Sequence, residues 1–562
     1  MYNRDLTLKI LLSVIALFLV TFVVIPAFLV FEVSFRGEEG GFSLEWYSEA
    51  FTSKSSLQAI LNTSIILVIC PLLGVSFGVL LSWIINRTNI PFRRVSKFIP
   101  FMPILLPPVV SSVGWVFLMS PKQGYVNLAL RNIGEALGFS MGDSGPFNIN
   151  TFGMLLFIIA SIIVPYSYIY VSNAFNNMDS SLEEASQISG ASQWRTLAKV
   201  SMPLVVPAIL SSLLLALVIS VSEFAASSII GVPADVKVMP TLIHQSMTNY
   251  PQSLGLATAL GSILIVIVAV GVYFQNRITK DTSYITITGK GYRTNLINLG
   301  GWKWLAFSLV LAYAIIAIFL PIGAIFVVSL LPYWSPEVGL DQANFSHYQE
   351  IFANKTATGS MTNTIILAIL GTTFTNIIAF IMAIIIVRTK RKGNKLFELL
   401  GMATLGIPGI VFSIGALTFF TESPLSLYGT HYPLLIMYTV IFLPLILRSM
   451  VTALMQVHPE LEEASFLSGA NTWKTLARIL LPVLAPSIAT SWVLGFILVT
   501  HELPASTLLT VPGLQVMSTY LLGVWGDGAI SSSAAFAMIM FVISAIAVLG
   551  GQWFAAAFSK RH

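Results

Sequence analysis

Two blocks of the sequence carry the same carboxylates and the same glycine in the same order. Residues 183–203 read EEASQISGASQWRTLAKVSMP and residues 462–482 read EEASFLSGANTWKTLARILLP, with twelve of 21 positions identical. Carboxylates at the start of a short helix are stabilised by the helix dipole, and a glycine after the helix can end it with positive φ. Each block therefore predicts a short helix, a glycine bend and a second helix, which together would present a docking surface to a soluble partner.

A second pair of carboxylates, Glu223 and Glu502, recurs at the same spacing of 279 residues, and His501 precedes the second of them. Glu223 follows Pro203 by 20 residues, a rise of about 30 Å in a helix, so we expect both glutamates at the outer mouth of a membrane path. Oxygen ligands and negative potential suit a cation. The pattern predicts a substrate path along Glu223, Glu502 and His501, with transient metal contacts at the two glutamates. The alternative is that they are helix-end residues that hydrogen-bond the following loop or touch a binding protein.

Catalytic signatures are missing from the sequence. A phosphate-binding P-loop needs Gly-Lys followed by Ser or Thr, but the only Gly-Lys, at positions 289–290, is followed by Gly291. No nucleophile–base pair or metal-ligand motif stands out either. We therefore expect no enzymatic activity and no cofactor bound by this chain.

The rest of the sequence describes elements that would hold these residues in a membrane. Of 562 residues, 56% are apolar and 9% charged, whereas an ordinary soluble domain is about 25% charged. With 29 basic and 24 acidic side chains, a chain of this length could not cover a soluble surface, so lipid must be its main solvent. The single cysteine, Cys70, excludes an internal disulfide, and the dispersed net charge of +5 argues against nucleic acid as a partner.

Twelve apolar runs are long enough to cross a bilayer as helices, which takes about 20 residues each. Their continuity excludes an outer-membrane barrel, whose strands alternate apolar and polar residues. With the N-terminus inside, 23 of the 29 basic residues fall in inside segments; this bias predicts that both termini are cytoplasmic and that the protein lies in the inner (cytoplasmic) membrane. The runs lie near 10–31, 60–85, 98–118, 152–174, 203–222, 254–275, 304–331, 364–387, 399–420, 433–453, 483–500 and 532–557.

The sequence repeats itself as a whole. The spacing of 279 residues holds in the later part of each half, and a spacing of 301 pairs Tyr47 with Tyr348 and Arg87-Thr88 with Arg388-Thr389 earlier on. We infer two six-helix units, residues 1–280 and 304–562, joined by a cytoplasmic linker at 281–303. Because six is even, the units share one topology and are related by a pseudo-two-fold axis along the membrane normal, where a substrate path is expected. The alternative is a duplicated bundle without a shared path.

The duplicated block resembles the EAA loop of the permease subunits of binding-protein-dependent ABC importers. The match is carried by Glu184, Ala185, Ser186, Gly190 and Pro203, and by Glu463, Ala464, Ser465, Gly469 and Pro482. Both copies depart from the family pattern by serine at the third position, and the first copy also by valine and methionine before its proline. In place of docking, the glutamates could simply cap and solubilise a loop.

The resemblance implies an all-α, polytopic membrane protein made of two fused type I ABC permease units, with EAA loops at 178–203 and 457–482. It implies that each loop forms a coupling helix seated in a groove of a cytoplasmic ATPase subunit, so that two ATPase copies bind and hold ATP-Mg. An extracytoplasmic solute-binding protein would deliver the substrate. The residues that the resemblance assigns to ATPase coupling are Glu183, Glu184, Ala185, Gly190, Glu462, Glu463, Ala464 and Gly469.

The fused arrangement, the run ELPASTLL at Glu502–Leu509 and the run IPGI at Ile407–Ile410 are similar to the ferric-iron permease group. Thiamine, a phosphonate or a polyamine would suit the same architecture. A different class, the major-facilitator secondary transporters, also has two parallel six-helix halves. Its signature should stand between the second and third spans, where residues 87–94 read RTNIPFRR and lack the required glycine and aspartate.

Overall fold

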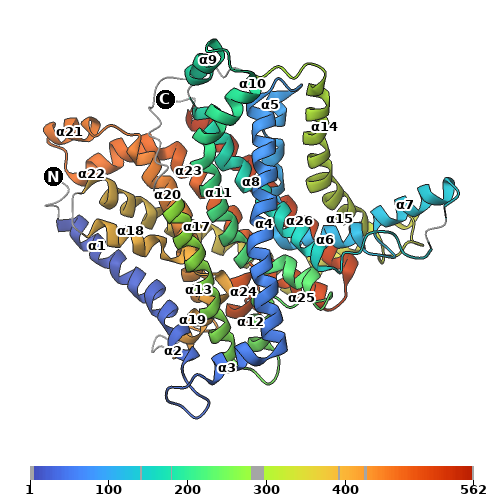
Figure 1. Ribbon diagram of the computed structural model, residues 1–562. Helices are drawn as coiled ribbons and strands as arrows, with labels where there is room; N and C mark the ends of the chain where they lie inside the picture. The colour runs from blue at the N-terminus through green and yellow to red at the C-terminus, as the bar shows by residue number, and fades with distance from the viewer. Residues whose placement is uncertain are drawn as a thin grey trace.

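The computed structural model describes residues 6–139, 142–178, 180–279, 296–389, 393–422 and 427–559. Within these ranges the regular structure is helical apart from two isolated bridges, and the long helices gather into one bundle (Figure 1). The prediction of an all-α membrane protein is confirmed.

Ten helical segments are long and apolar enough to cross a membrane, and they match ten of the predicted spans. In the first half these segments contain α1 (Leu6–Leu19) with α2 (Ile25–Ser34), α4 (Lys54–Arg87), α8 (Phe152–Asn177), α11 (Met202–Ser222) and α13 (Leu254–Thr279). In the second half they contain α14 (Trp302–Ala314) with α15 (Leu320–Leu330), α17 (Lys355–Arg388), α20 (Tyr432–Met455), α23 (Leu481–His501) and α26 (Ile530–Ser559).

The other two predicted spans are broken rather than continuous. Residues 93–105 meet α6 (Pro108–Met119) at a bend of 96°, and residues 394–406 meet α19 (Gly409–Glu422) at 108°. The bends fall at Leu106 and Ile407, which adopt extended backbone angles and each precede a proline. A residue before proline avoids the helical region, and proline lacks the N–H that a helix needs. The expectation of continuous helices near 98–118 and 399–420 was therefore wrong.

Equivalent contacts recur in the two halves. In each half an Asn-Thr pair in the long second span holds the loop that leads to the following short helix. The amides of Asn62 and Asn363 donate to the carbonyls of Lys237 and Gln515 at 2.8 and 3.0 Å, and the hydroxyls of Thr63 and Thr364 accept from the backbone N–H of Met239 and Met517 at 2.9 and 2.8 Å. The sequence duplication is thus also a duplication of structure.

The two halves interlock through their first spans. Helix α2 of the first half packs on α19 of the second, and α15 of the second half packs on α6 of the first. Glycines allow both contacts: a Cβ at Gly114 would lie 2.8 Å from the Pro321 Cβ, and a Cβ at Gly415 would overlap the Pro26 carbonyl. Overpacking at such positions is destabilising, which explains why each crossing has a glycine.

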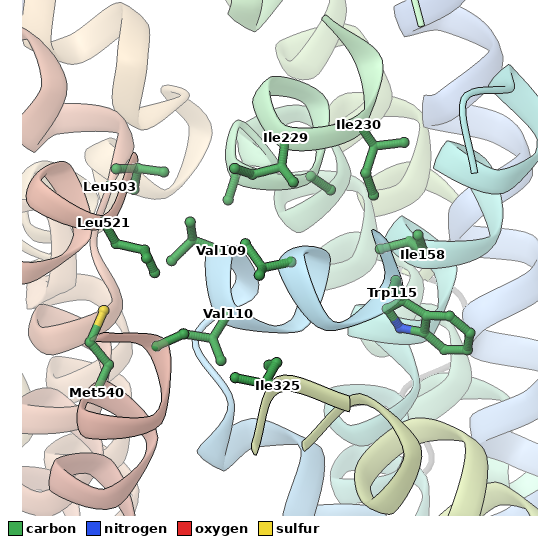
Figure 2. Packing of buried hydrophobic residues seen from close by; sticks show 14 of the residues in the cluster. Val109, Val110, Trp115, Ile158, Ile229, Ile230, Ile325, Leu503, Leu521 and Met540 are labelled. Atoms are coloured by element: carbon green, nitrogen blue, oxygen red, sulfur yellow. The ribbon is translucent and has the colours of Figure 1, made fainter. Parts of the chain in front are cut away.

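A shared apolar core fills the space between the halves. Figure 2 shows Val109 and Val110 of α6 between Ile325 of α15 and, on the other side, Leu521 and Met540 of the second half. All five side chains are buried. The protein therefore has a core to which both halves contribute, rather than two separate bundles.

The two halves differ most between α6 and α8. This segment contains α7 (Tyr125–Ala136), which projects sideways from the bundle in Figure 1, whereas α19 and α20 are joined by a much shorter connection. The difference in spacing between the two repeats falls in this loop, as the sequence predicts.

Candidate coupling loops and substrate path

Each duplicated block folds as a short helix, a bend and a second short helix. Helix α9 (Ser180–Ile188) precedes Gly190 with φ of 84°, and α21 (Glu460–Leu467) precedes Gly469 with φ of 82°. Only glycine adopts such angles without strain. The bends were predicted from the sequence, and the structure confirms them.

The second short helices begin with side-chain caps. Ser192 accepts a hydrogen bond from the N–H of Arg195 at the start of α10 (Gln193–Thr196), and Asn471 accepts one from Lys474 at the start of α22 (Thr472–Thr475). Such caps satisfy N–H groups that the first turn of a helix leaves free.

The serines that depart from the family pattern join the two short helices. The hydroxyls of Ser186 and Thr196 lie 2.9 Å apart, and those of Ser465 and Thr475 also lie 2.9 Å apart. Each hydrogen bond crosses the glycine bend. Serine at the third position of the motif thus fixes the angle of the loop.

The first glutamate of each block is buried and forms an ion pair. Glu183 is 6% exposed and pairs with Arg87 and with the hydroxyl of Ser201. Glu462 is 3% exposed, and its Oε1 lies 2.7 Å from Arg388 Nε. These carboxylates face the interior, so they do not offer a contact surface to a partner.

The neighbouring residues Glu184, Ala185, Glu463 and Ala464 are exposed, as a docking surface requires. The structure adds two apolar positions that sequence reasoning missed. Ile188 is 87% exposed and Leu467 is 88% exposed, each at the end of its short helix. The available signal was the recurrence of an apolar side chain two residues before each bend glycine.

The end of the predicted linker lies against the first coupling loop. Ile297 pairs with the backbone on both sides of Thr88: its N–H donates to the Arg87 carbonyl at 2.8 Å, and its carbonyl accepts from the Asn89 N–H at 3.2 Å. Ile297 also shares a small pocket with Glu183. Residues 280–295 of the linker region lie outside the described residues.

The two glutamates of the predicted substrate path cap the loops that follow their own helices. Glu223 is 7% exposed and accepts from the Ala226 N–H at 2.9 Å. Glu502 is also 7% exposed and accepts from the N–H groups of Ala505 at 2.6 Å and Ser506 at 3.0 Å. The geometry matches the helix-end alternative.

His501 is turned toward α26, where its Nε2 lies 3.0 Å from the Ser544 hydroxyl. Among the residues that the structure describes, no group of three or more His, Cys, Asp or Glu side chains is arranged to hold a metal ion. Glu223, Glu502 and His501 therefore do not form a preassembled metal centre in the described part of the chain.

The sequence matches the family model described as "Binding-protein-dependent transport system inner membrane component" over residues 72–284 and 375–561. The chain belongs to this family. One matched region falls in each half, so the protein is an all-α, multi-span ABC importer permease with two fused units. The major-facilitator alternative is wrong.

This permease is similar to curated relatives along most of its length. It is 26% identical to "Ferric transport system permease protein FbpB" of Actinobacillus pleuropneumoniae, over 86% of this chain and 69% of the relative. It is also 26% identical to "Putative ferric transport system permease protein FbpB 1" of Haemophilus influenzae, over 90% of this chain and 78% of the relative. A chain in the crystal structure of a bacterial ABC transporter that imports alginate aligns with 50% of this permease and 98% of its own length, at 21% identity and a TM-score of 0.44.

Proposed function

We propose that this permease forms the membrane path of an ATP-driven importer of ferric iron. The observation that carries the proposal is the similarity to ferric transport permeases, which extends over 86% and 90% of the chain and includes both halves. Thiamine, phosphonates and polyamines are the competing substrates for the same architecture.

The energy for transport comes from two copies of a cytoplasmic ATPase, which hold ATP-Mg; this chain contributes no cofactor and no catalysis. One ATPase copy docks on α9 and the other on α21. Exposed Glu184 and Ile188 on α9, and exposed Glu463 and Leu467 on α21, support this assignment because they offer matching charged and apolar contacts. Ala185 and Ala464 leave room for a close approach, and Gly190 and Gly469 set the bend.

Glu183 and Glu462 take a different part in coupling. Because they are buried in ion pairs with Arg87 and Arg388, they attach the coupling helices to the ends of α4 and α17 instead of touching the ATPase. A movement of the ATPase pair is then passed to two of the longest helices in the protein. This supports alternating access, in which the path between the halves opens to one side at a time.

An extracytoplasmic binding protein delivers the substrate to the outer mouth of the path. Both termini and both coupling loops lie in the cytoplasm, and residues 1–280 and 304–562 act as the two units on either side of the 281–303 linker. Transient metal contact at Glu223 and Glu502 would require their carboxylates to leave the N–H groups that they cap.

The test is uptake by proteoliposomes that contain the permease, its ATPase and its binding protein. We expect ATP-dependent accumulation of radioactive iron(III) supplied on the binding protein, and no accumulation with the permease alone. Thiamine, a phosphonate and a polyamine serve as competing substrates. ATP-dependent uptake of one of these without iron uptake would overturn the assignment to ferric iron, and uptake by the permease alone would overturn the ATP-driven mechanism.

A further inference from the structure

A small cavity of about 40 Å³ lies where the two halves of the protein meet. The first half contributes Ser111 of α6 and Ser161, Pro165 and Tyr166 of α8, whereas the second half contributes Ala317 and His501. The cavity therefore lies between the units, where an importer with a central path must pass its substrate.

Three of the lining side chains have hydrogen-bonding capacity that the described residues leave unused. His501 engages Ser544 through Nε2, and no described group hydrogen-bonds to its Nδ1. The hydroxyls of Ser111 and Tyr166 likewise have no hydrogen-bond partner among the residues of known placement. An unsatisfied polar group away from bulk water costs about 1–3 kcal/mol, so three such groups around one cavity indicate an occupant that binds them.

The polar lining is not repeated in the other half of the chain. At the spacings of 301 and 279 residues, Ser111 corresponds to Phe412 and Tyr166 to Leu445, while His501 corresponds to Ser222. Both halves keep the same helices with these different side chains, so the fold does not require a phenol or an imidazole here. The asymmetry points to a role in transport rather than in packing.

Size and chemistry restrict the occupant. A cavity of about 40 Å³ exceeds the roughly 10–15 Å³ that one water needs, but it is far below the roughly 300–1,000 Å³ of a site for an organic ligand. Phenol and hydroxyl oxygens with an imidazole nitrogen are ligands for metal cations. The Glu223 carboxylate acts electrostatically on Tyr166, which adds negative potential beside the phenol.

We propose that Tyr166, His501 and Ser111 form a transit site that coordinates a small, partly dehydrated metal cation as it passes between the halves. The proposal rests on the proposed function of iron import and identifies residues within that path. It assigns the chemistry to one side of the pseudo-two-fold axis, with the phenol supplied by the first half and the imidazole by the second.

The test uses the assembled complex of permease, ATPase and binding protein in proteoliposomes. Tyr166→Phe removes one oxygen and keeps the ring, and His501→Gln removes the imidazole. We expect each variant to lower ATP-dependent iron(III) uptake by roughly 10–100-fold, the range seen when support for a bound metal is lost, while the ATPase subunits still co-purify. Ser222→Ala, at the position equivalent to His501, is the matched control and should transport at the wild-type rate.

A spectroscopic readout separates a ligand from a packing residue. Iron(III) added to the solubilised complex should give the visible charge-transfer absorption of an iron–phenolate bond, and Tyr166→Phe should abolish it. If the wild-type complex imports iron and both variants import it equally well, the transit site is overturned and iron import stands. If the wild-type complex imports no iron, the proposed function fails and the site fails with it.

Discussion

Arg388 and Glu462 form an ion pair with 2.7 Å between Nε and Oε1, and Arg87 and Glu183 form the equivalent pair in the first half. Each arginine is the last residue of the long second span, and each glutamate lies in the first turn of a coupling helix. In both pairs the side chains are largely withdrawn from solvent. The coupling helices are therefore fixed to the membrane-spanning part by charge as well as by the chain.

Removing one partner of such a pair should detach the coupling helix. Arg388→Met leaves the buried Glu462 carboxylate without its cation, a change that typically costs about 3–5 kcal/mol. We expect a lower unfolding temperature and loss of the co-purifying ATPase. Glu463→Gln, at the exposed neighbouring position, is the control for stability. If the Arg388→Met protein unfolds at the wild-type temperature, the ion pair does not anchor the loop.

The bend glycines should resist replacement because of their backbone angles alone. Nothing lies within 4 Å of a Cβ built on Gly190 or Gly469, so Gly190→Val and Gly469→Val meet no clash but must adopt positive φ, at roughly 1–2 kcal/mol each. We expect the double variant to hydrolyse ATP without importing substrate, or to release the ATPase. Asn, which tolerates positive φ, should restore part of the uptake.

Gly429 gives a matched control for the bend variants. It has φ of 83° and equally open surroundings, but it lies in the connection between α19 and α20. Gly429→Val carries the same backbone strain and should leave ATPase recovery unchanged. An equal loss of ATPase in this variant would mean that general instability, and not the bend of the coupling loop, causes the effect.

The exposed apolar ends of the coupling helices should matter for docking but not for folding. Ile188→Ser and Leu467→Ser alter side chains that are 87% and 88% exposed, and substitutions at such surface positions usually change stability by less than about 0.5 kcal/mol. We expect the double variant to bind the ATPase more weakly in a pull-down titration, with an unchanged unfolding temperature. Ile133→Ser, on the projecting helix α7, controls for the loss of an exposed apolar residue.

The glycines at the crossings of the two halves predict a packing defect. A valine at Gly114 would press on Pro321, and overpacking of this kind costs typically about 1–3 kcal/mol. Gly323→Val, on the exposed side of α15 where nothing lies within 4 Å of a Cβ, should be tolerated. Equal unfolding temperatures for the two variants in detergent would contradict the interlocked arrangement.

The orientation can be read by cysteine labelling, because the single native cysteine, Cys70, is buried. Ser189→Cys, after α9, should be protected from a membrane-impermeant thiol reagent added outside intact cells. Gln252→Cys, before α13, should be labelled. The opposite pattern would invert the topology and place the coupling loops outside.

The features that the sequence predicts correctly depend on local rules. A glycine that ends a short helix and a repeated block both leave their mark within a few residues, so Gly190 and Gly469 could be assigned their conformation in advance. The prolines after Leu106 and Ile407 were equally visible, but the continuous apolar runs around them favoured straight spans. There the backbone requirement of proline prevailed over the hydrophobic pattern.

The parts that sequence reasoning missed depend on contacts between distant segments. Glu183 resembles its neighbour Glu184 in every local respect, and only the position of Arg87, 96 residues earlier, decides which of the two is buried. The role of Ile188 depends in the same way on which side of α9 the rest of the protein covers. Tyr166 lies within an apolar run and gains its proposed role only from His501, which comes from the other half.

The interlocking of the halves has a consequence for synthesis. Pro26 of α2 leaves the ribosome 389 residues before Gly415, the residue that it covers in the finished protein. At about 5–20 residues per second this delay lasts roughly 20–80 s. During that time the first span is in the membrane without its partner, so the earliest part of the protein to be made is among the last to reach its final contacts.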